Sequence, residues 1–118
     1  MTGSEYIRFL IAQGEHVHQD FKFEISDARK IAKTLSAFAN TEGGRLLIGV
    51  KDNGKIAGVR SDEEQYMIEA AAHLYCIPPV ECKMQVYEVE GRSVLVASVD
   101  ESTCKPVYAK DANGRKLA

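Results

Sequence analysis

The sequence lacks the features that define several protein classes. No hydrophobic run approaches the roughly 18 residues that a membrane-spanning helix needs, and no basic segment followed by a hydrophobic block opens the chain. The stretch 44–51 reads G-R-L-L-I-G-V-K, which is one residue too long for a phosphate-binding loop and is not followed by Ser or Thr. These absences argue against a membrane protein, a secreted protein and a nucleotide hydrolase.

Cysteine is also scarce. The chain contains Cys76, Cys82 and Cys104, and no two of them form a C-x-x-C pair, which makes a zinc ribbon or a thioredoxin-like site improbable. An odd number of cysteines without an export signal predicts reduced thiols in the cytoplasm. We expect these thiols to pack as small hydrophobic side chains.

What the sequence does contain is typical of one globular domain spanning residues 1–118. Of the 118 residues, 45% are hydrophobic and 27% are charged, which is enough for a single core. The net charge of −2 is unevenly distributed. Residues 22–60 hold eight basic and four acidic side chains and carry +4, so the remainder carries −6. This polarity predicts a basic face on an acidic body.

Hydrophobic periodicity predicts about three helices. The spacing of three and four residues favours helices over 3–13, from Ser26 or Asp27 to about Ala39, and over 62–76. In the second helix the buried stripe is expected to be Ala28, Ile31, Ala32, Leu35, Phe38 and Ala39.

The remaining segments predict about five strands. Alternation over 19–25 places Phe21, Phe23 and Ile25 on one buried face. Asp52-Asn53-Gly54 is a strong hairpin signal between strands at 45–51 and 55–59. Further strands are expected at 80–89 and 92–99, and residues 106–110 are expected to be extended. The predicted fold class is therefore α+β, with a mixed central sheet of about five strands. A turn at 112–115 followed by only three residues suggests that the natural protein continues and that this domain is truncated at its C-terminal end.

The segment from Asp20 to Val59 is the most distinctive part of the chain. It contains D-F-K, then a helix ending in A-F-A-N-T, then G-G-R-L-L-I-G-V, an acidic turn and I-A-G. In this order the motifs resemble the Schlafen-type AlbA domain, and the resemblance extends over about Glu15–Ala118. It departs at Asp20, where the family usually has glutamate, and at His16, where serine is common.

The resemblance implies a nucleic-acid-binding domain of a bacterial transcriptional regulator. It also implies an alternative, because some eukaryotic relatives cleave RNA with an acidic cluster, whose positions match Glu15, Asp20 and Asp52 here. Converging carboxylates suit Mg²⁺ or Mn²⁺, although Asp52 is also a favoured turn residue. A homodimerisation domain is a third alternative. No cofactor is otherwise expected, no small-molecule substrate is identified, and catalysis is not the leading interpretation.

The residues themselves also favour DNA or RNA as the partner. Cationic side chains and the backbone N–H groups beside glycines are the usual ligands of phosphates. The candidate binding residues are Lys22, Lys30, Lys33, Arg45, Lys51 and Lys55, with Asn40, Thr41, Gly43 and Gly44 at the bend. Asn40 and Thr41 have a competing role in ending the helix, and the glycines are expected to be required by the backbone. His16, His18 and Asp20 could hold a transition metal if their segment is extended.

Overall fold

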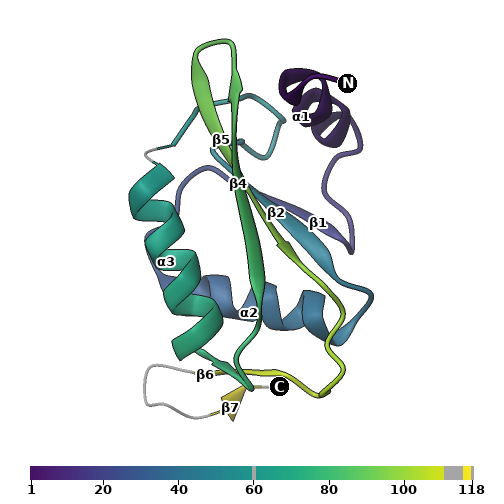
Figure 1. The fold of residues 1–118 in the computed structure, drawn as a ribbon, viewed down its shortest axis with the longest axis vertical. Helices are drawn as coiled ribbons and strands as arrows, with labels where there is room; N and C mark the ends of the chain where they lie inside the picture. Colours follow the sequence, from purple (N-terminus) through teal and green to yellow (C-terminus); the bar gives the residue numbers. More distant parts are fainter. Residues whose placement is uncertain (60, 111–115, 118) are drawn as a thin grey trace.

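The computed structural model describes residues 1–59, 61–110 and 116–117 (Figure 1). It contains the helices α1 (Gly3–Ala12), α2 (Ala28–Asn40) and α3 (Ser61–Leu74). Its strands are β1 (Gln19–Lys22), β2 (Gly44–Ile48), β3 (Cys76–Ile77), β4 (Cys82–Val89), β5 (Arg92–Val99), β6 (Tyr108–Lys110) and β7 (Lys116–Leu117). No helix in the described part is long and hydrophobic enough to cross a membrane.

The strands form two sheets. The larger sheet has the order β1-β2-β5-β4, in which β1 and β2 are parallel and the other pairs are antiparallel. The smaller sheet has the order β3-β6-β7. The predicted α+β class is confirmed, but the strands are divided between a four-stranded and a three-stranded sheet instead of forming one sheet of about five.

Helices cover both faces of the larger sheet. The helices α2 and α3 pack on one face, where the core includes Leu35, Leu46, Ile68 and Leu95. The helix α1 packs on the opposite face. The strand β2 is buried on both sides, because Leu46 and Ile48 face α2 and α3 while Leu47 faces α1. This explains why β2 reads as a continuous hydrophobic run.

The sequence pattern of α2 is confirmed in detail. Asp27 is the N-cap, and its carboxylate accepts a hydrogen bond of 2.9 Å from the Arg29 backbone N–H. The predicted stripe is buried, except that Ala28 is only partly covered. The outward residues Lys30 and Lys33 are exposed.

Two predicted strands differ from the structure. The strand β1 ends at Lys22, whose carbonyl oxygen accepts the N–H groups of Gly49 and Val50 just beyond β2. Phe23 consequently leaves the expected buried face and is 49% exposed. Residues 55–59 make one isolated bridge, Val50 with Ile56, and not the expected strand.

Smaller differences concern the C-terminal half. Cys76 and Ile77 belong to β3 instead of ending a helix.

The three thiols differ in their surroundings. Burial raises the pKa of the Cys76 thiol to about 11 and that of Cys82 to about 12, whereas Cys104 is exposed. The predicted turn at 112–115 and the basic residue Arg60 lie outside the described residues.

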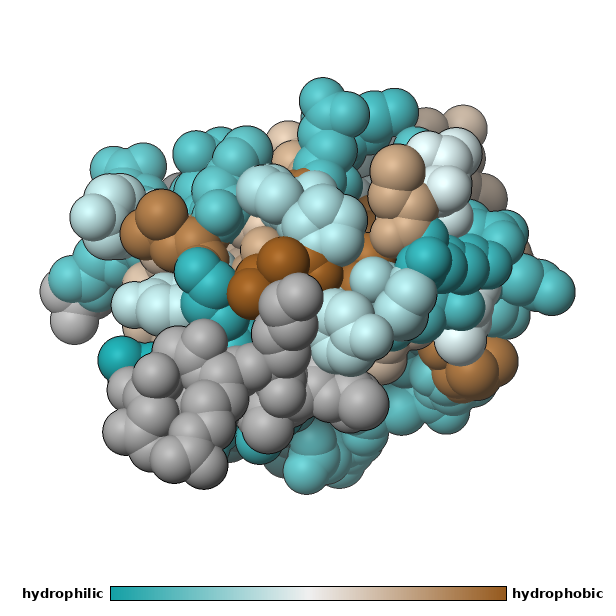
Figure 2. All heavy atoms as spheres, turned by 90° about the horizontal axis from the view of Figure 1, so that it is seen from below, coloured by the Kyte–Doolittle hydropathy of each residue, from teal (hydrophilic) through white to brown (hydrophobic). Residues whose placement is uncertain are grey.

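Different elements lie at the two ends of the molecule's longest axis. The turn between β4 and β5 lies beside α1 at the upper end of Figure 1, and α2 and β6 lie toward the lower end. Figure 2 shows the lower end, where hydrophilic residues cover most of the described surface and hydrophobic residues form separate patches.

Candidate nucleic-acid interface

The predicted site residues are divided between two regions at opposite ends of β2. We call residues 40–45 and the adjoining residues 98–101 the Gly-Gly end. We call residues 22–23, residues 51–56, the β4–β5 turn and the adjoining side of α1 the hairpin end. Since β2 runs from Gly44 to Ile48 and the chain then turns, Lys51 and Lys55 lie away from Gly43 and Gly44.

At the Gly-Gly end, the polar side chains hold the backbone. The Asn40 amide donates to the Val107 carbonyl oxygen at 2.9 Å and accepts from the Val107 N–H at 2.7 Å. The Thr41 hydroxyl donates back to the carbonyls of the last turn of α2. Both residues thus fix the helix end and the strand β6 segment beside it.

The two glycines at this end fit positions that a larger residue would disturb. Gly43 has a φ of +86°, and a Cβ there would lie 2.6 Å from the Val99 carbonyl oxygen. A Cβ on Gly44 would lie 2.6 Å from Cγ of Phe38. The glycines therefore permit close packing of the bend against β5 and α2.

Arg45 is engaged by neighbouring side chains. Its Nε donates to Oε1 of Gln19 at 2.8 Å, and its Nη2 donates to Oε1 of Gln13 at 2.9 Å. Gln19 is fully buried and donates its own amide to the carbonyls of Leu10 and Gly14. This chain of hydrogen bonds fastens the end of α1 to the sheet.

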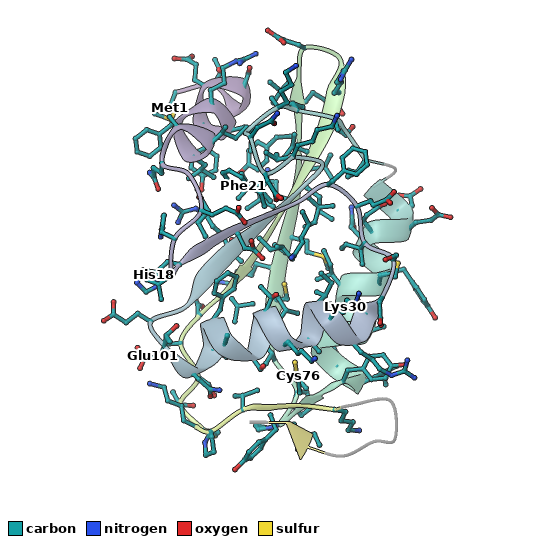
Figure 3. The ribbon with its side chains drawn as sticks, turned by 180° about the vertical axis from the view of Figure 1, so that it is seen from behind. Met1, His18, Phe21, Lys30, Cys76 and Glu101 are labelled. Carbon is teal, nitrogen blue, oxygen red and sulfur yellow. The ribbon has the colours of Figure 1, made fainter. Side chains whose placement is uncertain are left out.

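The histidine segment beside this end forms a turn. Residues 16–19 are closed by two backbone hydrogen bonds between His16 and Gln19, so the extended geometry assumed for a transition-metal site is wrong. His18 Nδ1 lies 3.0 Å from the Gly43 carbonyl oxygen and its Nε2 lies 3.7 Å from the Glu42 carboxylate. His18 and Glu101 both lie at this end in Figure 3.

The three candidate acidic residues lie in one neighbourhood. Contact with the Asp20 carboxyl, followed by partial burial and the charges of Asp20 and Asp52, raises the pKa of Glu15 above its usual value. Glu15 also accepts the Phe21 N–H at 3.2 Å. However, within residues 1–59, 61–110 and 116–117, no three His, Cys, Asp or Glu side chains converge closely enough to hold a metal ion.

At the hairpin end, a lysine lies against an aromatic ring. The Lys51 ammonium is 5.4 Å from the centroid of the half-exposed Phe23 ring. Lys22, the last residue of β1, has its ammonium 3.4 Å from the Asp20 carboxylate, and 41% of its side chain is exposed. Exposed lysine and aromatic groups are thus adjacent at the point where β1 ends.

Three residues in this region were missed by the sequence analysis. Phe23 was expected to be buried, and Arg8 and Arg92 lie outside the basic window of the sequence. Arg8 on α1 and Arg92 on β5 both border one hollow at the hairpin end. Basic residues so far apart in sequence give no local signal of being neighbours.

Comparisons with known proteins agree with this fold. A family model described as "Schlafen, AlbA_2" matches residues 15–116. The solved N-terminal domain of a Nitrosomonas europaea protein, described as related to the ATP-dependent DNA helicase RecG, is 27% identical with a TM-score of 0.74. The alignment covers 95% of this chain and 82% of that one.

A second solved structure shows the fold alone. The DIP2311 protein of Corynebacterium diphtheriae is 20% identical with a TM-score of 0.61; the alignment covers 95% of this chain but 24% of that protein. No curated protein sequence matches this chain. Because the family model covers most of the chain, including α2, the Gly-Gly bend and β2, the chain belongs to the Schlafen AlbA_2 family.

Proposed function

We propose that this domain binds nucleic acid at the hairpin end through Phe23, Lys51 and Lys22, and that it prefers single strands. The observation that carries the proposal is the half-exposed Phe23 ring with the Lys51 ammonium beside it. Single-strand binders combine aromatic rings, on which bases stack, with cations that hold the backbone. Lys22, the last residue of β1, precedes Phe23 in the chain, and we assign it the second phosphate contact.

The mixed charge of this surface limits how strongly it attracts a polyanion. Glu15, Asp20 and Asp52 lie among the lysines, so a large electrostatic contribution is not expected. With phosphate contacts from Lys22 and Lys51, the logarithm of the binding constant should fall with log salt at a slope of about −1.4 for a single strand. Base stacking on Phe23 then accounts for the part of the binding free energy that does not depend on salt.

Fluorescence anisotropy with a labelled oligothymidylate tests this proposal. Phe23→Ala should weaken binding by about tenfold, since stacking one base is worth about 1–3 kcal/mol. Phe9→Ala is the matched control, because Phe9 on α1 is 53% exposed and lies outside the proposed contact. Equal effects of the two substitutions, or no binding by the folded domain at low salt, would contradict the proposal.

Within a larger protein, we propose that the domain serves as the DNA-binding module of a bacterial transcriptional regulator. The family match and the similarity to the N-terminal domain of the RecG-related protein support a role in nucleic-acid handling. Comparing binding to single-stranded and duplex DNA of the same sequence checks this extension. Tighter binding to the single strand is expected; tighter binding to the duplex would contradict the single-strand preference and favour a regulator that reads promoters.

A second candidate is a ribonuclease that depends on Mg²⁺ or Mn²⁺. The close Glu15–Asp20 pair, with the charge of Asp52 nearby, supports it. The described residues offer no three-ligand group, so their arrangement in this structure does not fit an ion. Incubation of labelled RNA with either ion discriminates the candidates: cleavage that Asp52→Ala abolishes would favour the enzyme.

A further inference from the structure

A separate hollow of about 630 Å³ opens at the hairpin end. It lies between α1, residues 54–56 and the turn that joins β4 to β5, which gather at the upper end of Figure 1. Three basic side chains, Arg8, Lys55 and Arg92, border it from these three elements. Its remaining wall includes the hydrophobic residues Ile11 and Ile56.

Two contacts organise the basic side chains. Arg92 Nη1 donates to the Ile56 carbonyl oxygen at 3.0 Å, which holds this guanidinium at the wall. Arg8 Nη2 lies 2.6 Å from the Glu90 carboxylate, and this pair spans from α1 to the β4–β5 turn. Both partners are largely exposed, so the pair can be broken at low cost.

Glu90 has an unusual backbone conformation for its residue type. Its φ is +52°, in the left-handed region that residues other than Gly, Asn and Asp seldom adopt. The next residue, Gly91, also has a positive φ of +76°, which matches a two-residue hairpin turn that normally favours Asn-Gly. The turn thus presents a carboxylate to Arg8 at some conformational cost.

We propose that this hollow binds the phosphate monoester of a nucleotide, and that the Glu90 carboxylate occupies part of the site until the phosphate displaces it. Three cations and one carboxylate leave a net charge of +2, which matches a monoester dianion better than a single diester. Arginine forms paired hydrogen bonds with phosphate oxygens. The volume falls within the range of about 300–1,000 Å³ that small-molecule sites occupy, and the isoleucines offer contacts to sugar and base.

The phosphate could belong to a free nucleotide or to the end of a strand, and the two sources share this chemistry. The proposal goes beyond the nucleic-acid interface and fails separately from it, because Phe23 and Lys51 are not part of the hollow. Four probes distinguish the cases: AMP, adenosine, and one oligothymidylate with a 5′-phosphate or a 5′-hydroxyl. Calorimetry on the whole domain measures each affinity.

Three variants locate the binding. Lys55→Gln should weaken binding of the phosphorylated probes by about tenfold or more, which is the effect of losing one charge-assisted hydrogen bond. Glu90→Gln should raise the affinity for the phosphorylated probes about threefold or more. An unfolded variant could not bind more tightly than the wild type. Lys83→Gln is the matched control, since Lys83 is an exposed lysine on β4 outside the hollow.

Each outcome decides the proposal. A preference for AMP over adenosine, or for the 5′-phosphate strand over the 5′-hydroxyl strand, that Lys55→Gln reduces and Glu90→Gln increases would support it. A preference seen only for AMP over adenosine identifies a free nucleotide as the source of the phosphate. A preference seen only for the 5′-phosphate strand identifies a strand end. Equal affinities within both pairs, or a preference that neither variant changes, would overturn it, even if the oligothymidylate itself binds. Loss of oligothymidylate binding with retained AMP preference would instead overturn the proposed nucleic-acid interface.

Discussion

The Gly-Gly end and the hairpin end differ in how their polar groups are used. At the Gly-Gly end, Asn40, Thr41 and Arg45 are bonded to neighbouring parts of the chain. At the hairpin end, Lys51 and Lys55 keep exposed side chains, and the Phe23 ring is half uncovered. The most distinctive motif of the sequence therefore contributes mainly to the fold, and the groups free to contact a ligand lie beyond the other end of β2.

This difference has a physical cause. The bend between α2 and β2 must bring a helix end, β5 and the β6 segment close together, and buried backbone groups there need hydrogen-bond partners. The short amide and hydroxyl side chains of Asn40 and Thr41 supply them. In the turn at 51–56, by contrast, the charged residues Lys51, Asp52 and Lys55 are exposed to solvent.

The largest expected effect comes from Gly43→Ala. Its Cβ would meet the Val99 carbonyl oxygen in addition to the cost of a positive φ. Gly14→Ala is the matched control, because Gly14 has a φ of +72° and nothing within 4 Å of its Cβ position. We expect a loss of about 1–2 kcal/mol for Gly14→Ala and about 1–3 kcal/mol more for Gly43→Ala. Urea unfolding measures both, and equal losses would show that the bend is not closely packed.

The next effect concerns the amide of Asn40. Asn40→Ala should lower the free energy of unfolding by about 2–3 kcal/mol, because it leaves both polar backbone groups of the buried Val107 without their partner. Asn53→Ala removes one exposed hydrogen bond to the Lys55 N–H and should cost less than about 1 kcal/mol. If both substitutions cost the same in urea unfolding, the contrast between the two ends is wrong.

Much of the fold could be predicted from local pattern. The bounds of β5 agree with the prediction, and the stripe of α2 follows from its period, because both signals depend on neighbouring residues. Within the candidate site, the internal roles weighed for Asn40 and Thr41 agree with their contacts.

The remainder depends on contacts between distant segments. The strand β1 ends where Gly49 and Val50 bond the Lys22 carbonyl oxygen, and Phe23, the next residue, is half exposed. Nothing in the sequence shows that Arg45 is hydrogen-bonded, because its partners Gln13 and Gln19 are distant in the chain. Hydrophobic alternation carries no information about such partners.

The smallest expected effect is a pH dependence at Glu15. A carboxyl whose pKa is raised in the folded state binds more protons folded than unfolded, so its contribution to stability is present at low pH and is lost as pH rises through the folded pKa. Glu15→Gln keeps an acceptor for the Phe21 N–H and removes the repulsion. It should therefore be more stable at pH 7 by up to about 0.5 kcal/mol, discounted for exposure.

The difference between Glu15→Gln and the wild type should vanish below about pH 3, where glutamate is protonated in both states. Glu81→Gln, an exposed glutamate elsewhere, controls for the change in net charge. A constant difference in thermal unfolding across this pH range would exclude the proposed repulsion between Glu15 and its acidic neighbours.

Mapping oligothymidylate contacts by NMR, with backbone amide shifts of the whole domain, shows which end of β2 binds the strand. We expect binding at the hairpin end, with the largest changes at residues 22–23 and 51–56 and little change at residues 40–45. Shifts centred on the Gly-Gly end, with residues 51–56 unaffected, would contradict it.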